Sequence, residues 1–213
     1  MINTPLNVKI EKTAINELPI ESFNGNIHVI ETVETAAEAI RSLRKAECLG
    51  IDTETKPSFR KGRTNQVSLI QIATHTDCYL FRINKIGFTD ELRELLADST
   101  LLKVGLSLKD DFSVLHRVGD FEPRNYVELQ SLVRQYGIAD MSLQKIYAII
   151  FGKKISKSQR LSNWEAAELS VSQKYYAALD AWACLHIYDA LQENRPFYIN
   201  NCRLSAHDAN NAT

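Results

Sequence analysis

Two acidic residues stand in a short segment with strand-forming neighbours, Ile51-Asp52-Thr53-Glu54-Thr55. We expect a strand over residues 49–53, and because strand side chains alternate between faces, Asp52 and Glu54 share one face with Cα atoms roughly 6.6 Å apart. Like charges on one face repel each other, and acidic residues are disfavoured in strands. A bound cation would offset this repulsion. A lone pair with this spacing also occurs at solvated strand ends, so the motif alone leaves both interpretations open.

Tyr176 and Asp180 form a second candidate pair. They are four residues apart in a helix that we expect to run from an N-cap at Ser172 to about residue 191. This spacing places both side chains on one helix face, where they can act on one reacting centre. Asp180 has apolar neighbours, and an acid in such surroundings costs free energy unless it is paired or binds a metal. The structural alternatives are a core tyrosine with a surface hydroxyl and an aspartate facing solvent.

A third candidate pair, Asp110 and Asp111, follows a buried strand expected at residues 101–104 and lies at the start of a helix expected at 111–117. Acidic residues at a helix N-terminus are explained by capping and by the helix dipole. The functional alternative is that one of the two turns toward Asp52 and Glu54.

The remaining sequence alternates strands and helices, which is typical of an α/β fold. Further strands are expected at 27–30, 67–73, 78–81 and 126–128, with 67–73 and 78–81 forming an antiparallel hairpin. Further helices are expected at 34–46, 90–97, 129–136 and 142–151.

The composition is that of an ordinary globular protein. The 213 residues are 45% hydrophobic with a net charge of −1, which excludes collagen, long coiled coils and wholesale disorder. The four cysteines form no CxxC pair, which argues against a zinc finger or a thioredoxin-like site. No apolar run approaches the roughly 18 residues that span a bilayer, and the N-terminus lacks a secretory signal pattern. We therefore expect a cytoplasmic protein without a membrane partner.

Basic residues are concentrated in two stretches that contain no acid. The first holds Lys56, Arg60, Lys61 and Arg63, and the second holds Lys153, Lys154, Lys157 and Arg160. Each stretch alone is explained as a solvated surface loop. Beside a metal site, either could contact phosphate.

Together, the three acidic segments resemble the three motifs of the ribonuclease D and Werner-type 3′-5′ exonucleases, the tyrosine subtype of the DEDD nuclease superfamily. The resemblance covers about residues 27–191. It rests on 51–54 and the strand at 67–73, on 104–111 with Leu115, and on 160–164 followed by 176–181. The histidine subtype requires a histidine near position 176, and none of the five histidines lies there.

The resemblance implies a ribonuclease H-like fold, a mixed sheet of about five strands with helices on both faces. It also implies that four carboxylates, Asp52, Glu54, Asp111 and Asp180, bind two divalent metal ions, Mg²⁺ or Mn²⁺, and that Tyr176 holds the attacking water. Asp111 is preferred because an apolar pair follows it three and four residues later, and Asp110 is the fallback.

The implied function is metal-dependent hydrolysis of phosphodiester bonds at DNA or RNA 3′ ends by a two-metal-ion mechanism, releasing nucleoside 5′-monophosphates. We expect nucleic acid to contact Arg60, Lys61, Arg63, Arg160 and Trp164. Trp164 packing beneath the site is the alternative for that residue. The alternative functions are a catalytically silent nucleic-acid-binding or scaffold domain with the same fold and a structural interaction module.

The chain is expected to divide into an N-terminal arm (1–25), an exonuclease domain (26–192) and a polar C-terminal tail (193–213). We expect no helical nucleic-acid-binding domain of the ribonuclease D type after residue 191. No protein partner is evident from the sequence.

Overall fold

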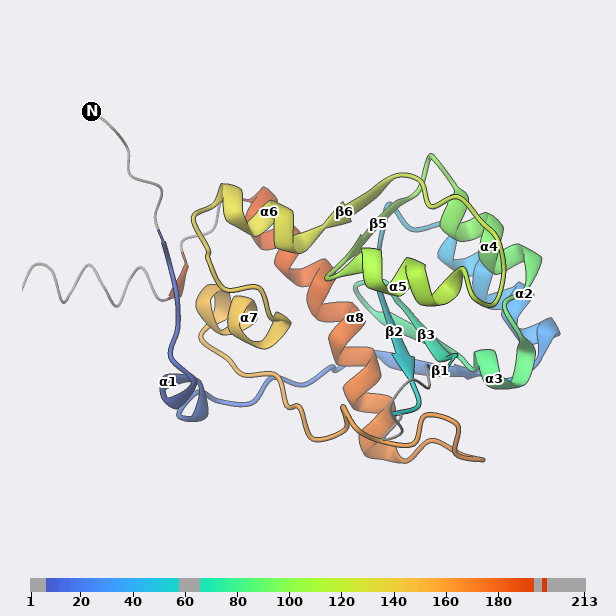
Figure 1. The fold of residues 1–213 in the computed structure, drawn as a ribbon, viewed down its shortest axis with the longest axis horizontal. Coiled ribbons are helices and arrows are strands. Elements are labelled where there is room, and N and C mark those ends of the chain that lie inside the picture. The colour runs from blue at the N-terminus through green and yellow to red at the C-terminus, as the bar shows by residue number, and fades with distance from the viewer. Residues whose placement is uncertain (1–6, 58–65, 194–196, 199–213) are drawn as a thin grey trace, which may run out of the picture.

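In the computed structural model, which describes residues 7–57, 66–193 and 197–198, six strands form one mixed sheet (Figure 1). They are β1 (Asn26–Ile30), β2 (Cys48–Thr55), β3 (Val67–Ala73), β4 (Asp77–Phe81), β5 (Leu102–Gly105) and β6 (Tyr126–Glu128), in the spatial order β1-β4-β3-β2-β5-β6. β2, β3 and β4 pair antiparallel, as predicted for the hairpin, and the other three pairings are parallel. The sheet has one strand more than the family resemblance implies, and its six strands lie at the six places where the sequence predicts strands, with the short β6 pairing with β5 at the edge.

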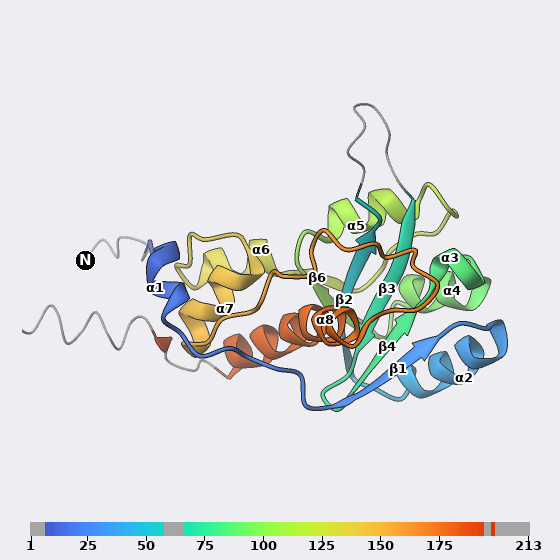
Figure 2. The same ribbon diagram turned by 90° about the horizontal axis from the view of Figure 1, so that it is seen from below.

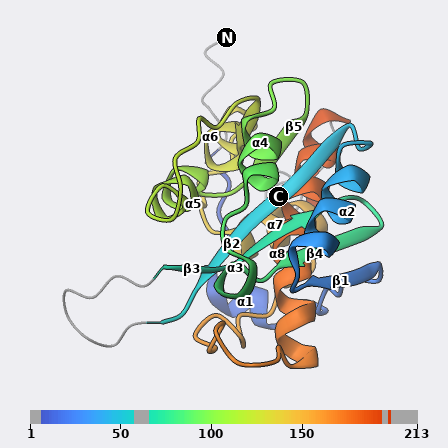
Figure 3. The ribbon, with the colours of Figure 1, turned by 90° about the vertical axis from the view of Figure 1, so that its right-hand side faces the viewer.

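Helices cover both faces of the sheet, which confirms the expected layering. They are α1 (Lys12–Asn16), α2 (Val33–Leu43), α3 (Ile83–Ile86), α4 (Asp90–Ala97), α5 (Leu108–Leu115), α6 (Leu129–Gln135), α7 (Leu143–Phe151) and α8 (Val171–Gln192). Helices α6, α7 and α8 pack into one apolar core with one side of the sheet, and α2 to α5 pack into a second core on the other side (Figure 2). β2 and β3 are the longest strands, and they extend together past their neighbours (Figure 3).

The long helix α8 lies directly against β2, and Gly50 makes this approach possible. A Cβ atom added to Gly50 would lie 2.1 Å from the carbonyl oxygen of Ala181, so only glycine accommodates the helix at this distance. Ala181 follows Asp180, and Gly50 lies two residues before Asp52 on the same strand face. The contact therefore sets the distance between the two aspartates.

The start of α8 differs from the prediction. Ser170 is the N-cap, with its side chain bonded to the Gln173 backbone N–H and the Gln173 side chain bonded to the Ser170 N–H. Ser172, the expected N-cap, lies inside the first turn. The reciprocal capping box selects the earlier serine, because it satisfies two backbone N–H groups at once.

Helix α5 begins three residues earlier than expected, and neither acidic residue caps it. Its N-cap is Ser107, whose backbone has a positive φ of 65° and whose side chain makes no capping bond. The carboxylate of Glu128, at the end of β6, instead accepts hydrogen bonds from the N–H groups of Ser107 and Leu108 at 2.9 and 2.7 Å. This releases Asp110 and Asp111 from the capping role.

The N-terminal residues that are described take part in the core. Val8, Ile10, Ile15 and Phe23 are buried in the same apolar cluster as α6 to α8, and Val8 bridges to Ile138. The predicted boundaries of arm, domain and tail stay predictions. Among the described residues, no helix is both long and apolar enough to cross a bilayer, and the expected cytoplasmic location also stays a prediction.

Candidate metal centre

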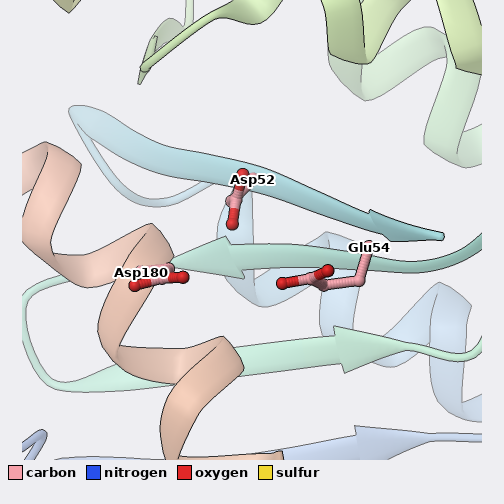
Figure 4. A group of neighbouring side chains, drawn as sticks. All are labelled: Asp52, Glu54 and Asp180. Carbon is pink, nitrogen blue, oxygen red and sulfur yellow. The ribbon is translucent and has the colours of Figure 1, made fainter. Parts of the chain in front are cut away.

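Three of the predicted acidic residues converge where β2 meets α8. Asp52 and Glu54 extend from the same face of β2, and Asp180 extends from α8 toward them (Figure 4). One carboxylate oxygen from each lies within 4.8 Å of the others. Three hard oxygen donors at this spacing fit a divalent ion such as Mg²⁺ or Mn²⁺.

Asp111 lies next to this group through Thr53. The Thr53 hydroxyl donates a hydrogen bond to Asp111 Oδ1 at 2.5 Å, and the Asp111 side chain is buried whereas Asp110 is exposed. Burial, followed by the charge of Asp52, raises the pKa of Asp111 well above its usual range. The structure thus brings Asp111, and not the fallback Asp110, to the acidic cluster.

Without a cation, the carboxylates of the cluster disfavour one another's ionised forms. Burial and the charge of Asp180 raise the pKa of Asp52 well above its ordinary value. Burial and the charges of Asp52, Asp180 and Asp111 raise the pKa of Glu54 to about 9. Burial raises the pKa of Asp180 to about 7, against the opposing effects of a hydrogen bond from Tyr176 and of the Lys157 charge. Ionising all four acids together therefore requires added positive charge.

The described residues supply little of that charge. The salt bridges found between described residues involve none of the four acids. Lys157 lowers the pKa of Asp180 and Arg160 lowers that of Glu54 by longer-range attraction. Both cations are exposed on the segment that leads into α8. The donor set therefore fits a bound metal ion better than an internal ion-pair network.

Tyr176 faces the cluster, as the four-residue spacing predicts. Its hydroxyl lies close enough to the Asp180 carboxylate to lower the pKa of Asp180. Burial and the charges of Asp180 and Glu54 raise the pKa of Tyr176 far above its usual value, so the hydroxyl stays protonated at neutral pH. Tyr176 is therefore a hydrogen-bond donor in the site and not a free base.

The five expected nucleic-acid contacts differ in where they lie. Trp164 is fully buried, and its ring centroid lies 6.1 Å from that of Tyr176. The expectation that Trp164 touches nucleic acid is therefore wrong for this structure, because no part of the ring is accessible, and the packing alternative holds. The other expected contacts, Arg60, Lys61 and Arg63, lie outside the described residues, and Arg160 is exposed beside the cluster.

The segment that carries Trp164 is tied to the sheet by two basic residues, of which the sequence pointed only to Lys56, as part of a basic stretch. The fully buried Arg82 donates to the carbonyl of Ala166 at 2.5 Å, and Lys56 forms a 2.9 Å salt bridge with Glu165. Thr53 and Glu128 were also missed. The position of Thr53 between two candidate ligands was the available signal, whereas Arg82 and Glu128 act across long sequence separations that no local pattern reveals.

Comparisons with known proteins agree with this geometry. Residues 27–195 match a family model described as 3′-5′ exonuclease. The chain is 33% identical over 151 residues to a 3′-5′ exonuclease of Arabidopsis thaliana, covering 68% of this chain and 52% of that protein. It is 29% identical over 193 residues to the bifunctional 3′-5′ exonuclease/ATP-dependent helicase WRN of Mus musculus, covering 85% of this chain and 14% of that protein.

A solved structure shows the same fold. RNase D of Escherichia coli, an exoribonuclease involved in structured RNA processing, superimposes with a TM-score of 0.70 and 25% identity, covering 78% of this chain and 44% of that one. The ribonuclease H-like expectation is thereby confirmed. The chain spans only about half or less of the length of these relatives.

Proposed function

Because the chain belongs to the 3′-5′ exonuclease family, we propose that it is a metal-dependent enzyme that removes nucleotides from the 3′ end of a nucleic acid strand. The single observation that carries this proposal is the convergence of the Asp52, Glu54 and Asp180 carboxylates within 4.8 Å, with the Tyr176 hydroxyl beside Asp180. The products would be nucleoside 5′-monophosphates.

The acidic cluster and the family imply use of a divalent metal. For the finer point, we propose that Asp52, Glu54, Asp111 and Asp180 hold two ions, Mg²⁺ or Mn²⁺, since four carboxylates balance the charge of two such ions. When bound, the ions would activate water and stabilise the charge on the attacking and leaving oxygens. Thr53 would fix the orientation of the Asp111 carboxylate through its hydrogen bond.

The other residues of the site would orient the attacking water and bind the phosphates of the strand. Tyr176, protonated, would donate a hydrogen bond that holds the attacking water, and the buried Trp164 would support the Tyr176 ring. Lys157 and Arg160 would attract the phosphates of the incoming strand. Arg60, Lys61 and Arg63 stay candidates for the same role.

The test uses single-stranded DNA and RNA labelled at the 5′ or the 3′ end, incubated with Mg²⁺, Mn²⁺ or EDTA. We expect a metal-dependent ladder that shortens from the 3′ end and disappears in Asp52→Ala. Using both sugars is necessary because one relative is named for RNA processing and another carries a helicase. Asp110→Ala is the matched control, because this exposed acid lies beside Asp111 and outside the cluster. Binding of either strand without any turnover would instead establish the silent-domain alternative.

A further inference from the structure

A small cavity lies beside Tyr176, between α8, the segment around Ser156 and the N-terminal segment. Its volume is about 190 Å³, and apolar groups make up most of its wall. Its lining includes Glu21, Ser156, Ser158, Ser172, Tyr175, Tyr176 and Leu179. Nothing in the proposed chemistry of the carboxylates requires this cavity.

We propose that this cavity binds one nucleobase of the substrate strand, with Tyr175 as the surface on which the base stacks. The inference rests on the proposed function and extends it from the reacting phosphate to a neighbouring base. The occupant is a base because Tyr176, which lines the cavity, also lies beside the carboxylate cluster. A strand held at the carboxylates therefore has its bases next to the cavity.

Tyr176 connects the two sites. It lines the cavity and also lies beside Asp180, one helical turn away on the same face of α8, so a group in the cavity lies one side chain away from the acidic cluster. Ser172, Tyr175 and Leu179 follow each other at helical spacing, so they form one stripe along the first turns of α8. A strand whose phosphate reaches the carboxylates can therefore place a base against this stripe.

The size and lining of the cavity suit a single planar ring. Pockets for whole small molecules have volumes of roughly 300–1,000 Å³, and this cavity is smaller. Tyr175 is half exposed, at 50%, so it offers an accessible aromatic residue for stacking. Serine hydroxyls both donate and accept hydrogen bonds, so they can satisfy the edges of different bases. Binding by such a site is tolerant of base identity.

The charges around the cavity are compatible with a polyanionic strand. Lys157 lies in the chain between the two lining residues Ser156 and Ser158, and its positive charge acts on Asp180. The acid in the lining, Glu21, is paired with Lys153 at 3.0 Å and accepts a hydrogen bond from Tyr147 at 2.8 Å. The Glu21 charge is thus offset within the protein and does not oppose the approach of a phosphate.

The experiment uses fluorescent single-stranded DNA oligonucleotides that carry one abasic residue at successive positions from the 3′ end. Binding is measured by fluorescence anisotropy with Ca²⁺ in place of Mg²⁺, and cleavage is measured separately with Mg²⁺. Tyr175→Ala is compared with Tyr175→Phe, which keeps an aromatic face, and with Val33→Ala, an exposed apolar residue on α2 across the sheet. Circular dichroism melts verify that each variant is folded.

We expect an abasic residue at one position near the 3′ end to weaken binding to the wild-type protein about tenfold, in the range of a lost stacking contact. Tyr175→Ala should weaken binding of the intact strand to a similar extent and have no further effect on that abasic strand. Tyr175→Phe and Val33→Ala should bind like the wild type. Ser172→Phe, which fills the cavity from its rim, should reproduce the Tyr175→Ala pattern.

The inference is overturned if Tyr175→Ala and Ser172→Phe leave binding unchanged, or if they weaken binding of intact and abasic strands equally. Failure of the proposed function is a different result, since the wild-type protein would then cleave no strand with any metal. The anisotropy measurement still tests whether the cavity binds a base in that case, because it depends on binding and not on turnover.

Discussion

The Thr53 hydroxyl donates a 2.5 Å hydrogen bond to Asp111 Oδ1, although strand alternation turns Thr53 away from the face that carries Asp52 and Glu54. The bond joins α5 to β2 at the position between two candidate metal ligands. Asp111 is thereby held near the other acids from the opposite side of the strand. Thr53, the residue between the two acids of the motif, therefore has a structural role of its own.

Replacing Thr53 with valine should weaken the metal site while leaving the fold intact. Valine has nearly the same shape but cannot donate a hydrogen bond, so the Asp111 carboxylate loses its orienting partner. The loss of such a partner typically costs about 10- to 100-fold in metal affinity or activity. The measurement is the Mg²⁺ concentration needed for half-maximal cleavage. Thr53→Ser, which keeps the hydroxyl, should stay close to the wild type, and an unchanged Mg²⁺ requirement in Thr53→Val would contradict the role.

Tyr176→Phe should lower the cleavage rate on the order of 10²-fold, as expected for the loss of one positioned hydrogen-bond donor. The raised pKa of Tyr176 keeps its hydroxyl protonated, so the deficit should be the same from pH 6 to pH 9. Calorimetric titration with Mn²⁺ should show that metal binding is retained. A deficit that grows or vanishes with pH would instead assign a titrating role to Tyr176.

Without metal, stability should fall as the pH rises from about 4 to about 9. The pKa values of Glu54 and Asp180 are raised in the folded state, to about 9 and about 7, whereas both groups ionise near pH 4 in the unfolded chain. The folded state then holds more protons, and its stability is lost as the pH passes through the raised pKa values. Urea unfolding in EDTA across this range measures the slope.

Glu54→Gln removes one of the titrating groups, so it should flatten that pH dependence and raise stability at high pH. Asp110→Asn serves as the control, because this side chain is exposed and lies outside the cluster. Adding Mg²⁺ to the wild-type protein should also flatten the curve. Stability that increases with pH in EDTA would show that folding does not raise the pKa values of these carboxylates.

Gly50→Ala should destabilise the protein and reduce activity. The new Cβ would meet the backbone carbonyl of Ala181 at 2.1 Å, and a backbone atom cannot rotate away as a side chain can. Overpacking of this kind costs typically about 1–3 kcal/mol, and the shift of α8 would separate Asp180 from Asp52. Gly119→Ala is the matched control, since the nearest atom there is the end of the Arg93 side chain. Equal melting temperatures for the two variants would refute the close-contact argument.

Local patterns predicted the regular elements well. The segment 67–73 forms a strand with the predicted ends, and Asp90–Ala97 forms the predicted helix, because hydrophobic periodicity and turn residues act over a few positions. Predictions of helix starts were less accurate. Two serines near α8 fit the N-cap preference equally, and only the partner side chain of Gln173 selects Ser170. The capping of α5 by Glu128 comes from a strand 20 residues away, which no window over the helix could show.

The sequence by itself determined which acids share a face, since the two-residue spacing of Asp52 and Glu54 and the four-residue spacing of Tyr176 and Asp180 follow from the geometry of single elements. Tertiary structure alone decided how these pairs meet. The contact of Gly50 with Ala181 brings α8 to β2, and the Thr53 bond selects Asp111 over Asp110. Packing also buried Trp164 beneath Tyr176. Such contacts join residues far apart in the chain, so their distances depend on how whole elements pack and not on local spacing.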